Sequence, residues 1–174
     1  AKTVGTFDCE FGYSCMGYEI AGAWGQKMAA PDRDVIAMVG DGSYLMMNSD
    51  IYSTVLTGHK LIIVVMDNGG FAVINRLQNA KGSKSFNNLI ADSKIETLVG
   101  VDFAKHAESM GAVAETVHSI GDLEQAFARA KKADRTAVIV IKVQSHQWTP
   151  GDAWWEVGVP EVSPRKEVRA ARAD

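Results

Sequence analysis

The chain has 174 residues, of which 47% are hydrophobic and 22% are charged, and its formal net charge is −3. This length suits a single domain with a sizeable core, and the slightly acidic balance argues against nucleic-acid binding, which needs a basic face. No apolar run approaches the ~20 residues of a membrane span, the first residues lack the order of a signal peptide, and two cysteines, Cys9 and Cys15, predict reduced thiols in a cytoplasmic protein.

The predicted secondary structure alternates between helices and strands. In chain order we expect a helix over residues 17–30, a strand over 35–39, a helix over 45–56, a strand over 61–66, a helix over 102–110, a weaker strand over 112–117, a helix over 122–132 and a strand over 137–143. The three stronger strand candidates are nearly continuous apolar runs, typical of strands buried on both faces of a parallel sheet. The pattern predicts an α/β fold with a mostly parallel central sheet and helices on both faces.

Two segments lie outside these elements. Residues 75–94 are polar and predict either a mobile loop near a substrate or a surface excursion, and Asn75 and Gln78 are candidates to face substrate hydroxyls. The second segment is aromatic, so its rings must be buried somewhere. We expect it either to pack against the domain or a partner subunit, or to cover the active site. Its aromatic residues are His146, Trp148, Trp154 and Trp155.

Polar residues follow two of the predicted strands at the point where each strand ends. Asp41 stands between Gly40 and Gly42, and Asn68 precedes two further glycines. Ligands of parallel α/β sheets bind at the carboxyl ends of the strands. Asp41 offers a carboxylate oxygen and Asn68 an amide oxygen, and Mg²⁺ prefers such hard donors together with phosphate oxygens and water. The backbone amides of Gly42 and Ser43, just before a helix, would donate to those phosphates.

These residues predict a clamp for Mg²⁺ and a diphosphate across two neighbouring strand ends. Taken alone, Gly-Asp-Gly also suits a tight turn followed by a helix cap. A phosphate-binding α/β domain without catalytic activity is therefore an alternative, and the pairing with a second polar strand end favours the clamp.

The two strand ends together resemble the motif of the thiamine-diphosphate enzyme family. In that family Gly-Asp-Gly is followed, after a spacer, by Asn-Asn; here GDGS at 40–43 is followed at the usual separation by DNGG at 67–70, with Asp67 in place of the first Asn. The role of Asp67 is open. The resemblance implies three magnesium ligands, two through side chains and one through a backbone carbonyl: Asp41, Asn68 and Gly70. It implies cofactor contacts at the other motif residues: Gly40, Gly42, Ser43 and Gly69.

The segment upstream of the first motif extends the resemblance. Residues 14–17, SCMG, resemble the Gly-Thr-Met-Gly segment of the acetolactate-synthase-like branch. This implies that Met16 supports the bent cofactor, since a flexible thioether fills the gap between two rings well, and that the backbone of Ser14 and Met16 faces the aminopyrimidine ring. A narrower resemblance, which includes GDAWWEVGVPEVS at 151–163, is to the family members that open a cyclic 1,2-dione by C–C hydrolysis in inositol catabolism.

The resemblance also implies how the chain is organised. Residues 1–160 would form the cofactor-binding domain, followed by a polar tail over 161–174. The family needs a glutamate that protonates the aminopyrimidine ring, and this residue lies in a separate pyrimidine-binding domain across a subunit interface. Because Glu10, Glu19 and Glu96 stand in no matching context, we expect no catalytic residue in this chain. The pyrimidine-binding domain would come from the same or a neighbouring chain, within at least a dimer.

The implied function is hydrolysis of a C–C bond of a cyclic dione in myo-inositol degradation, with thiamine diphosphate and Mg²⁺ as cofactors. One alternative is an acetolactate-synthase-like carboligase or 2-oxoacid decarboxylase, which shares the motif. Another is a non-catalytic diphosphate-binding module or one subunit of a split enzyme. Since the chain opens with Ala rather than Met, we expect it to be a piece of a longer protein.

Overall fold

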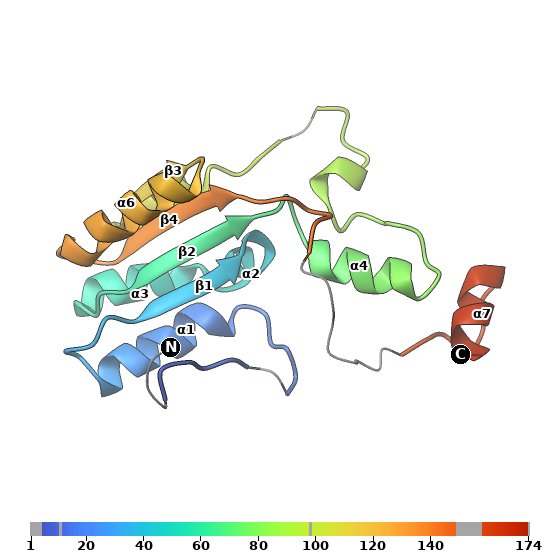
Figure 1. The fold of residues 1–174 in the computed structure, drawn as a ribbon, viewed down its shortest axis with the longest axis horizontal. Helices are drawn as coiled ribbons and strands as arrows, with labels where there is room; N and C mark the ends of the chain where they lie inside the picture. The colour runs from blue at the N-terminus through green and yellow to red at the C-terminus, as the bar shows by residue number, and fades with distance from the viewer. Residues whose placement is uncertain (1–4, 11, 98, 149–157, 174) are drawn as a thin grey trace. The chain divides into compact units, whose positions relative to one another are not determined.

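The computed structural model describes residues 5–10, 12–97, 99–148 and 158–173 (Figure 1). It divides into two compact units. The larger unit comprises Ala1–Asp67 and Val101–Lys142, and the smaller unit comprises Asn68–Gly100 and Val143–Asp174. The chain thus passes into the smaller unit directly after two strands of the larger unit end, at Asp67 and at Lys142.

The larger unit is built on a sheet of four parallel strands in the order β1-β2-β4-β3. The strands are β1 (Ile36–Gly40), β2 (Ile62–Asp67), β3 (Val113–Val117) and β4 (Ala137–Lys142). Gly40 pairs with Met66, and Asp67 pairs with Lys142, so β1, β2 and β4 end side by side. All four predicted strands are confirmed, as is the parallel α/β fold.

Helices cover both faces of this sheet, as predicted (Figure 1). The helices of the larger unit are α1 (Tyr18–Ala29), α2 (Asp41–Met47), α3 (Ser49–Thr57), α5 (Phe103–Ser109) and α6 (Ile120–Lys132). One core joins α1, α3 and α5 to one face, and a second core joins α6 to the other. Alternate residues of β2 pack into the two cores, because successive side chains of a strand point to opposite faces. Ile63 and Val65 belong to the first core, and Ile62 and Val64 belong to the second.

One predicted helix differs from the structure. The single helix expected over 45–56 is two helices, α2 and α3, which meet at Asn48. The Asn48 side-chain amide donates to the Leu45 carbonyl at 3.2 Å, and such side-chain bonds compete with the helical ladder. The helix also begins earlier than expected, at Asp41 itself, where an acidic first turn suits the helix dipole.

The smaller unit contains α4 (Ala72–Ala80), a 3₁₀ turn η1 (Ile90–Asp92) and α7 (Lys166–Ala173). The segment 75–94, expected as a loop, therefore begins inside a helix. The range 161–174, expected as a polar tail, holds α7, in which Val168 is buried. The Arg165 guanidinium donates to the Gly82 carbonyl at 3.0 and 3.1 Å.

The aromatic segment after β4 is described as far as Trp148. The Trp148 ring lies under the Arg76 guanidinium, 4.7 Å from the ring centroid, and makes an edge contact with His146. The described part of this segment therefore contacts α4 within the smaller unit, through Trp148. Trp154 and Trp155 lie outside the described residues.

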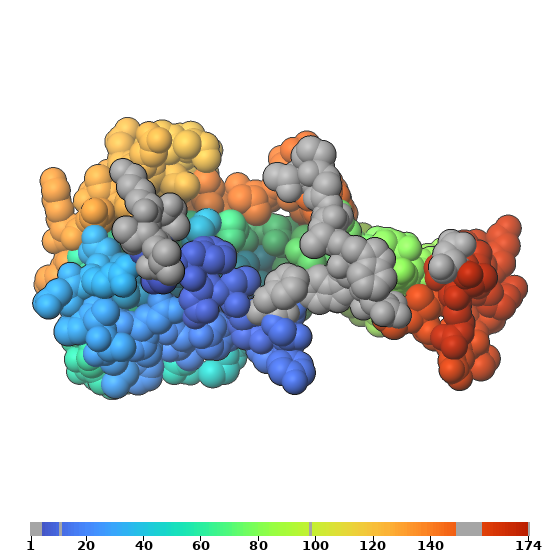
Figure 2. All heavy atoms as spheres, turned by 60° about the horizontal axis from the view of Figure 1, so that its bottom comes forward, coloured from blue at the N-terminus to red at the C-terminus, as the bar shows by residue number. Residues whose placement is uncertain are grey.

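The N-terminal segment of the larger unit lies against α1 (Figure 2). The Asp8 carboxylate accepts hydrogen bonds from the Tyr18 hydroxyl at 3.0 Å and from the Gln26 side-chain amide at 2.8 Å. These contacts hold the chain that leads into the turn before α1.

Two threonines form a buried relay of hydrogen bonds between α3 and the sheet. The Thr136 oxygen accepts from the Leu61 amide at 3.1 Å and lies 2.7 Å from the Thr54 oxygen. The Thr54 hydroxyl donates to the Ile51 carbonyl at 2.7 Å, so the Thr136 hydroxyl must donate to Thr54. Each hydroxyl has one proton, and the relay uses both.

We expect Thr136→Val to lower the free energy of unfolding by about 2–3 kcal/mol, because it leaves a buried amide and a buried hydroxyl without their partner. Thr57→Val is the matched control, since Thr57 is an exposed threonine whose hydroxyl bonds the Ser53 carbonyl; its effect should stay within about 0.5 kcal/mol. Urea denaturation measures both variants, and equal losses would contradict the relay.

Asp67 and Lys142 form an ion pair where β2 and β4 end. The two residues are register partners in the parallel ladder, and the Lys142 ammonium donates to the Asp67 carboxylate. The Asp67 side chain is 5% exposed, whereas the Lys142 side chain is 65% exposed. The lysine stem thus reaches from solvent to a carboxylate that the fold has buried. Asp67 therefore joins the ends of β2 and β4 through an ion pair.

Lys142→Met removes the ammonium and keeps much of the stem, so we expect a loss of about 1–3 kcal/mol in unfolding free energy, because a buried carboxylate loses its ion-pair partner. In the background of Asp67→Asn, the same change should cost less than about 0.5 kcal/mol. The double-mutant cycle, followed by urea denaturation, gives the coupling between the two side chains. A coupling near zero would show that the pair adds nothing to stability.

Candidate functional site

The junction of β1 and α2 presents a buried carboxylate beside helix amides. Gly40 ends β1 with an extended backbone (φ −73°, ψ 157°) and caps α2, and Asp41 follows as the first helical residue. The Asp41 residue is 3% exposed, and Gly42 and Ser43 are buried beside it. The first amides of a helix have no carbonyl partner within the helix. The amides of Gly42 and Ser43 are therefore suited to an anion.

The turn before α1 packs against the C-terminal end of α2, at Met46 and Met47. A Cβ added at Gly17, whose φ is +97°, would lie 2.5 Å from Met47 Cγ on α2, so only glycine allows this approach. Met16, directly before Gly17, is half-buried, and Ser14 takes a left-handed backbone with φ +50°. The structure thus brings the segment of Ser14 and Met16 to the helix that begins at Asp41.

A carboxylate fixes the shape of this turn. Glu10 accepts hydrogen bonds from the Cys15 amide at 2.6 Å and the Tyr13 amide at 3.0 Å. These backbone bonds, chiefly that from Cys15, lower the pKa of Glu10. At the start of α1, the Glu19 carboxylate accepts from the Gly17 amide at 2.8 Å. Two of the three glutamates considered above are therefore engaged with backbone amides, and the third, Glu96, is exposed.

The turn after β2 is held by a short antiparallel bridge in the smaller unit. Gly69 (φ +80°) and Gly70 (φ +140°) follow Asn68, and Gly70 bridges to Leu89. The Gly69 carbonyl accepts from the Ile90 amide at 2.9 Å. A Cβ on Gly70 would lie 2.3 Å from the Asn88 carbonyl oxygen, so this position admits only glycine.

The bridge bears on the predicted metal ligand at Gly70. Its two hydrogen bonds use the carbonyl of Gly69 and the amide of Phe71, which donates to Asn88 at 2.7 Å. Neither group belongs to Gly70, and the ligand role of the Gly70 carbonyl stays a prediction. Asp41 belongs to the larger unit and Asn68 to the smaller. The shared metal site stays a prediction.

The two polar candidates on α4 differ in their surroundings. The Gln78 side chain is engaged with the loop after α4: it donates to the Lys84 carbonyl at 2.8 Å and accepts from the Asn88 side-chain amide. Asn75 is 2% exposed, and its side-chain oxygen has no hydrogen-bond partner among the residues that the structure describes. Buried polar atoms of this kind are rare and call for an explanation. The structure therefore favours Asn75 over Gln78 as a group that a ligand or water completes.

Three polar residues near these elements had no role in the sequence analysis. The Tyr44 hydroxyl, on α2, lies 3.0 Å from His106 Nδ1 on α5, and burial raises the pKa of Tyr44. The Ser145 hydroxyl donates to the Asn68 backbone carbonyl at 2.6 Å. Each contact joins residues far apart in the sequence, so no local pattern signals it. Lys142 could have been matched to Asp67 only by pairing the two apolar strands β2 and β4 in register.

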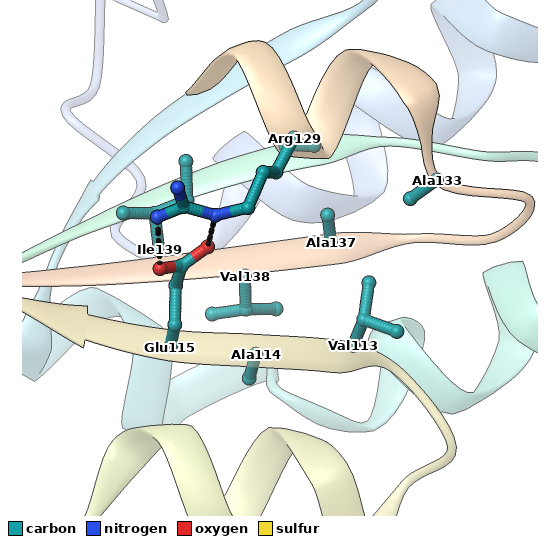
Figure 3. Close-up of a pocket in the computed structure, with 9 residues that line it drawn as sticks. Val113, Ala114, Glu115, Arg129, Ala133, Ala137, Val138 and Ile139 are labelled. Carbon is teal, nitrogen blue, oxygen red and sulfur yellow. Dashed lines mark hydrogen bonds and ion pairs between the residues drawn. The ribbon is translucent and has the colours of Figure 1, made fainter. Parts of the chain in front are cut away.

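A pocket of about 260 Å³ lies elsewhere in the larger unit, between α6 and the strands β3 and β4 (Figure 3). A bidentate ion pair lies in it: the Arg129 guanidinium donates to the Glu115 carboxylate at 3.0 and 2.6 Å. The pocket wall is otherwise made of alanine, valine and isoleucine side chains. None of the predicted site residues lines it.

Two features are absent from the residues that the structure describes. No group of three or more His, Cys, Asp or Glu side chains is gathered there as for a metal. The predicted magnesium set uses one carboxylate with amide and carbonyl oxygens, so it is outside that pattern. Within the same residues, every helix is too short or too polar to cross a membrane.

Comparison with known proteins agrees with the resemblance noted from the motifs. The family model described as the thiamine pyrophosphate enzyme, C-terminal TPP binding domain, matches residues 2–141. A 3D-(3,5/4)-trihydroxycyclohexane-1,2-dione hydrolase of Geobacillus thermodenitrificans is 43% identical over 98% of this chain, and its Bacillus subtilis counterpart is 41% identical over 95%. The chain spans only 28% and 26% of those two proteins.

A solved structure shares the fold. The thiamine diphosphate-dependent 4-hydroxybenzoylformate decarboxylase of Rhodococcus jostii RHA1 superposes with a TM-score of 0.66 and 25% identity, over 74% of this chain and 23% of that one. Sequence match, fold and the paired strand ends lead to one assignment. The chain belongs to the thiamine pyrophosphate enzyme family, as its C-terminal, cofactor-binding domain.

Proposed function

We propose that this chain is the diphosphate-binding domain of an enzyme that hydrolyses a C–C bond of a cyclic 1,2-dione in myo-inositol degradation. The observation that carries the proposal is the 43% identity to a trihydroxycyclohexanedione hydrolase over 98% of the chain. That match continues past residue 141, where the general family match ends. The narrower resemblance therefore includes a segment beyond the residues that the family model matches.

We propose that Mg²⁺ is bound by the side chains of Asp41 and Asn68 and the carbonyl of Gly70. The donor set fits the ion, because carboxylate, amide and carbonyl oxygens are the hard ligands that Mg²⁺ takes together with phosphates. Parallel pairing of Gly40 with Met66 makes the two strands end side by side, and these residues follow those ends along the chain.

The diphosphate contacts would come from the two motifs, and the ring contacts from the turn before α1. The proposed diphosphate and backbone contacts are Gly40, Gly42, Ser43 and Gly69. Ser14 and Met16 would face the aminopyrimidine ring, supported by the packing of their turn on α2. When bound, thiamine diphosphate supplies an electron sink for breaking a bond beside a carbonyl. The chain's own residues hold and orient it.

The glutamate and the second half of the site would come from a pyrimidine-binding domain of the same or a neighbouring chain. The engagement of Glu10 and Glu19 with backbone amides supports this, since neither is available to protonate a ring. If that domain belongs to a neighbouring chain, the site is shared between subunits and the protein is a homo-oligomer of at least two copies. The cytoplasmic location stays a prediction.

The substrate would be a small ring ketone that carries hydroxyl groups. The unpartnered oxygen of Asn75 supports such a substrate, because a hydroxyl donor would complete it. The alternative is an acetolactate-synthase-like carboligase or 2-oxoacid decarboxylase, which the fold shared with a 4-hydroxybenzoylformate decarboxylase keeps in play. A non-catalytic diphosphate-binding module or a split-enzyme subunit would bind the same cofactor without turnover on its own.

Asp41→Ala should weaken binding of thiamine diphosphate by at least 100-fold in the native polypeptide that contains this chain, because the metal loses its only carboxylate ligand. Titration calorimetry with Mg²⁺ present measures this, and excess EDTA should abolish binding to the unaltered protein. Asp134→Ala is the control, since Asp134 is an exposed aspartate paired only with its neighbour Arg135 in the contacts described. Binding that survives both EDTA and Asp41→Ala would leave Gly-Asp-Gly as a turn.

The same native polypeptide should consume trihydroxycyclohexane-1,2-dione with a kcat/KM at least 100-fold above that for pyruvate. Ring opening is measured by the loss of dione absorbance and the appearance of an acid. Pyruvate consumption is measured by a coupled assay. Consumption of pyruvate alone would favour the carboligase or decarboxylase. Cofactor binding without turnover of either substrate would favour the binding module.

A further inference from the structure

We propose that Ser145 is a positioning residue for Asn68, the proposed magnesium ligand. This inference rests on the proposed function, because it gives Ser145 a role only if Asn68 binds the metal. Ser145 lies beyond the end of β4, within the smaller unit, and takes no part in the family motif.

The contact itself is short and joins distant parts of the chain. The Ser145 hydroxyl donates to the Asn68 backbone carbonyl at 2.6 Å, across 77 residues of sequence, and both residues are half-buried. The acceptor is the backbone oxygen, so this bond does not use the side-chain amide that would bind the metal. It fixes the peptide that leads from Asn68 into the glycine turn.

That peptide needs fixing because two glycines follow it. Gly69 and Gly70 both take positive φ angles, +80° and +140°. Because glycine also adopts many other backbone conformations, these angles must be held by contacts outside the two residues. Downstream, the turn is held to the segment of Leu89 by the bonds from Ile90 to Gly69 and from Phe71 to Asn88. Upstream of the glycines, the hydrogen bond from Ser145 to the Asn68 carbonyl holds the other end of the turn.

The chain order explains how Ser145 comes to this point. Asp67 and Lys142 are the last paired residues of β2 and β4, and both chains continue from there into the smaller unit. Asn68 follows the first of these residues directly, and Ser145 lies shortly after the second. The ion pair therefore ties the two strands at their ends, and the Ser145 bond ties their continuations.

A fixed carbonyl limits rotation about ψ of Asn68 and so limits where its side chain can approach a metal. Residues that orient a metal ligand without touching the metal typically change metal affinity by 10- to 100-fold when they are removed. A bond with only a structural role would instead alter stability and leave the metal affinity unchanged.

The test compares Ser145→Ala, Ser145→Thr and Ser93→Ala in the native polypeptide that contains this chain. Ser93 is a matched control, because its hydroxyl also donates to a backbone carbonyl, that of Ile90, at 2.7 Å in the same unit. Mg²⁺ is titrated into metal-free protein with saturating thiamine diphosphate, followed by calorimetry. We expect about 10-fold weaker Mg²⁺ binding for Ser145→Ala, and values within threefold of the unaltered protein for Ser145→Thr and Ser93→Ala.

Each other outcome decides the matter. Mg²⁺ affinity of Ser145→Ala within twofold of the unaltered protein, or a loss equal to that of Ser93→Ala, overturns the positioning role. If thermal unfolding shows that Ser145→Ala does not fold, Ser145→Cys replaces it, and the weaker thiol donor should still reduce the affinity more than Ser93→Ala does. Unaltered protein that binds no Mg²⁺ would overturn the proposed function and this inference together, whereas unchanged affinity in Ser145→Ala alone overturns only the inference.

Discussion

The parallel register of β1, β2 and β4 is the constraint on which the rest of the structure depends. A slip of one residue would separate Asp67 from Lys142, its register partner and ion-pair partner, and turn the buried Asp67 carboxylate to the opposite face of the sheet. It would also exchange Ile63 and Val65 with Ile62 and Val64 between the two cores. The consequence of this register is that Gly40, Met66 and the pair of Asp67 with Lys142 mark one end of the sheet. The polar motifs follow from that end.

Burying carboxylates at this end has a cost that the fold offsets locally. Asp41 is 3% exposed and the Asp67 side chain 5% exposed, and a buried charge without compensation is strongly unfavourable. Asp67 is compensated by Lys142, whose stem reaches it from solvent. Asp41 stands in the first turn of α2, where helix amides favour a negative charge. The proposed cation would add to that compensation, so folding and metal binding would act on the same group.

How much the sequence predicts depends on the range of the interaction. The strands were predictable because continuous apolar runs report burial on both faces, and the motif residues because two glycine-flanked polar residues follow strands. The break at Asn48 was missed because it depends on one side-chain bond to Leu45. Helix α7 was missed because its anchor is the distant Gly82 carbonyl. The contact of Ser145 with Asn68 spans 77 residues, and no local pattern encodes it.

The replacement of the family's first Asn by Asp67 can now be explained by its surroundings. A second carboxylate directly before the metal ligand would be expected to compete for the cation or to distort its ligand set. In this chain the Asp67 carboxylate is turned to the Lys142 ammonium, its register partner on β4. Its charge is thereby matched within the sheet by the Lys142 ammonium. In this chain the acidic residue at position 67 thus has a cation at the end of the neighbouring strand.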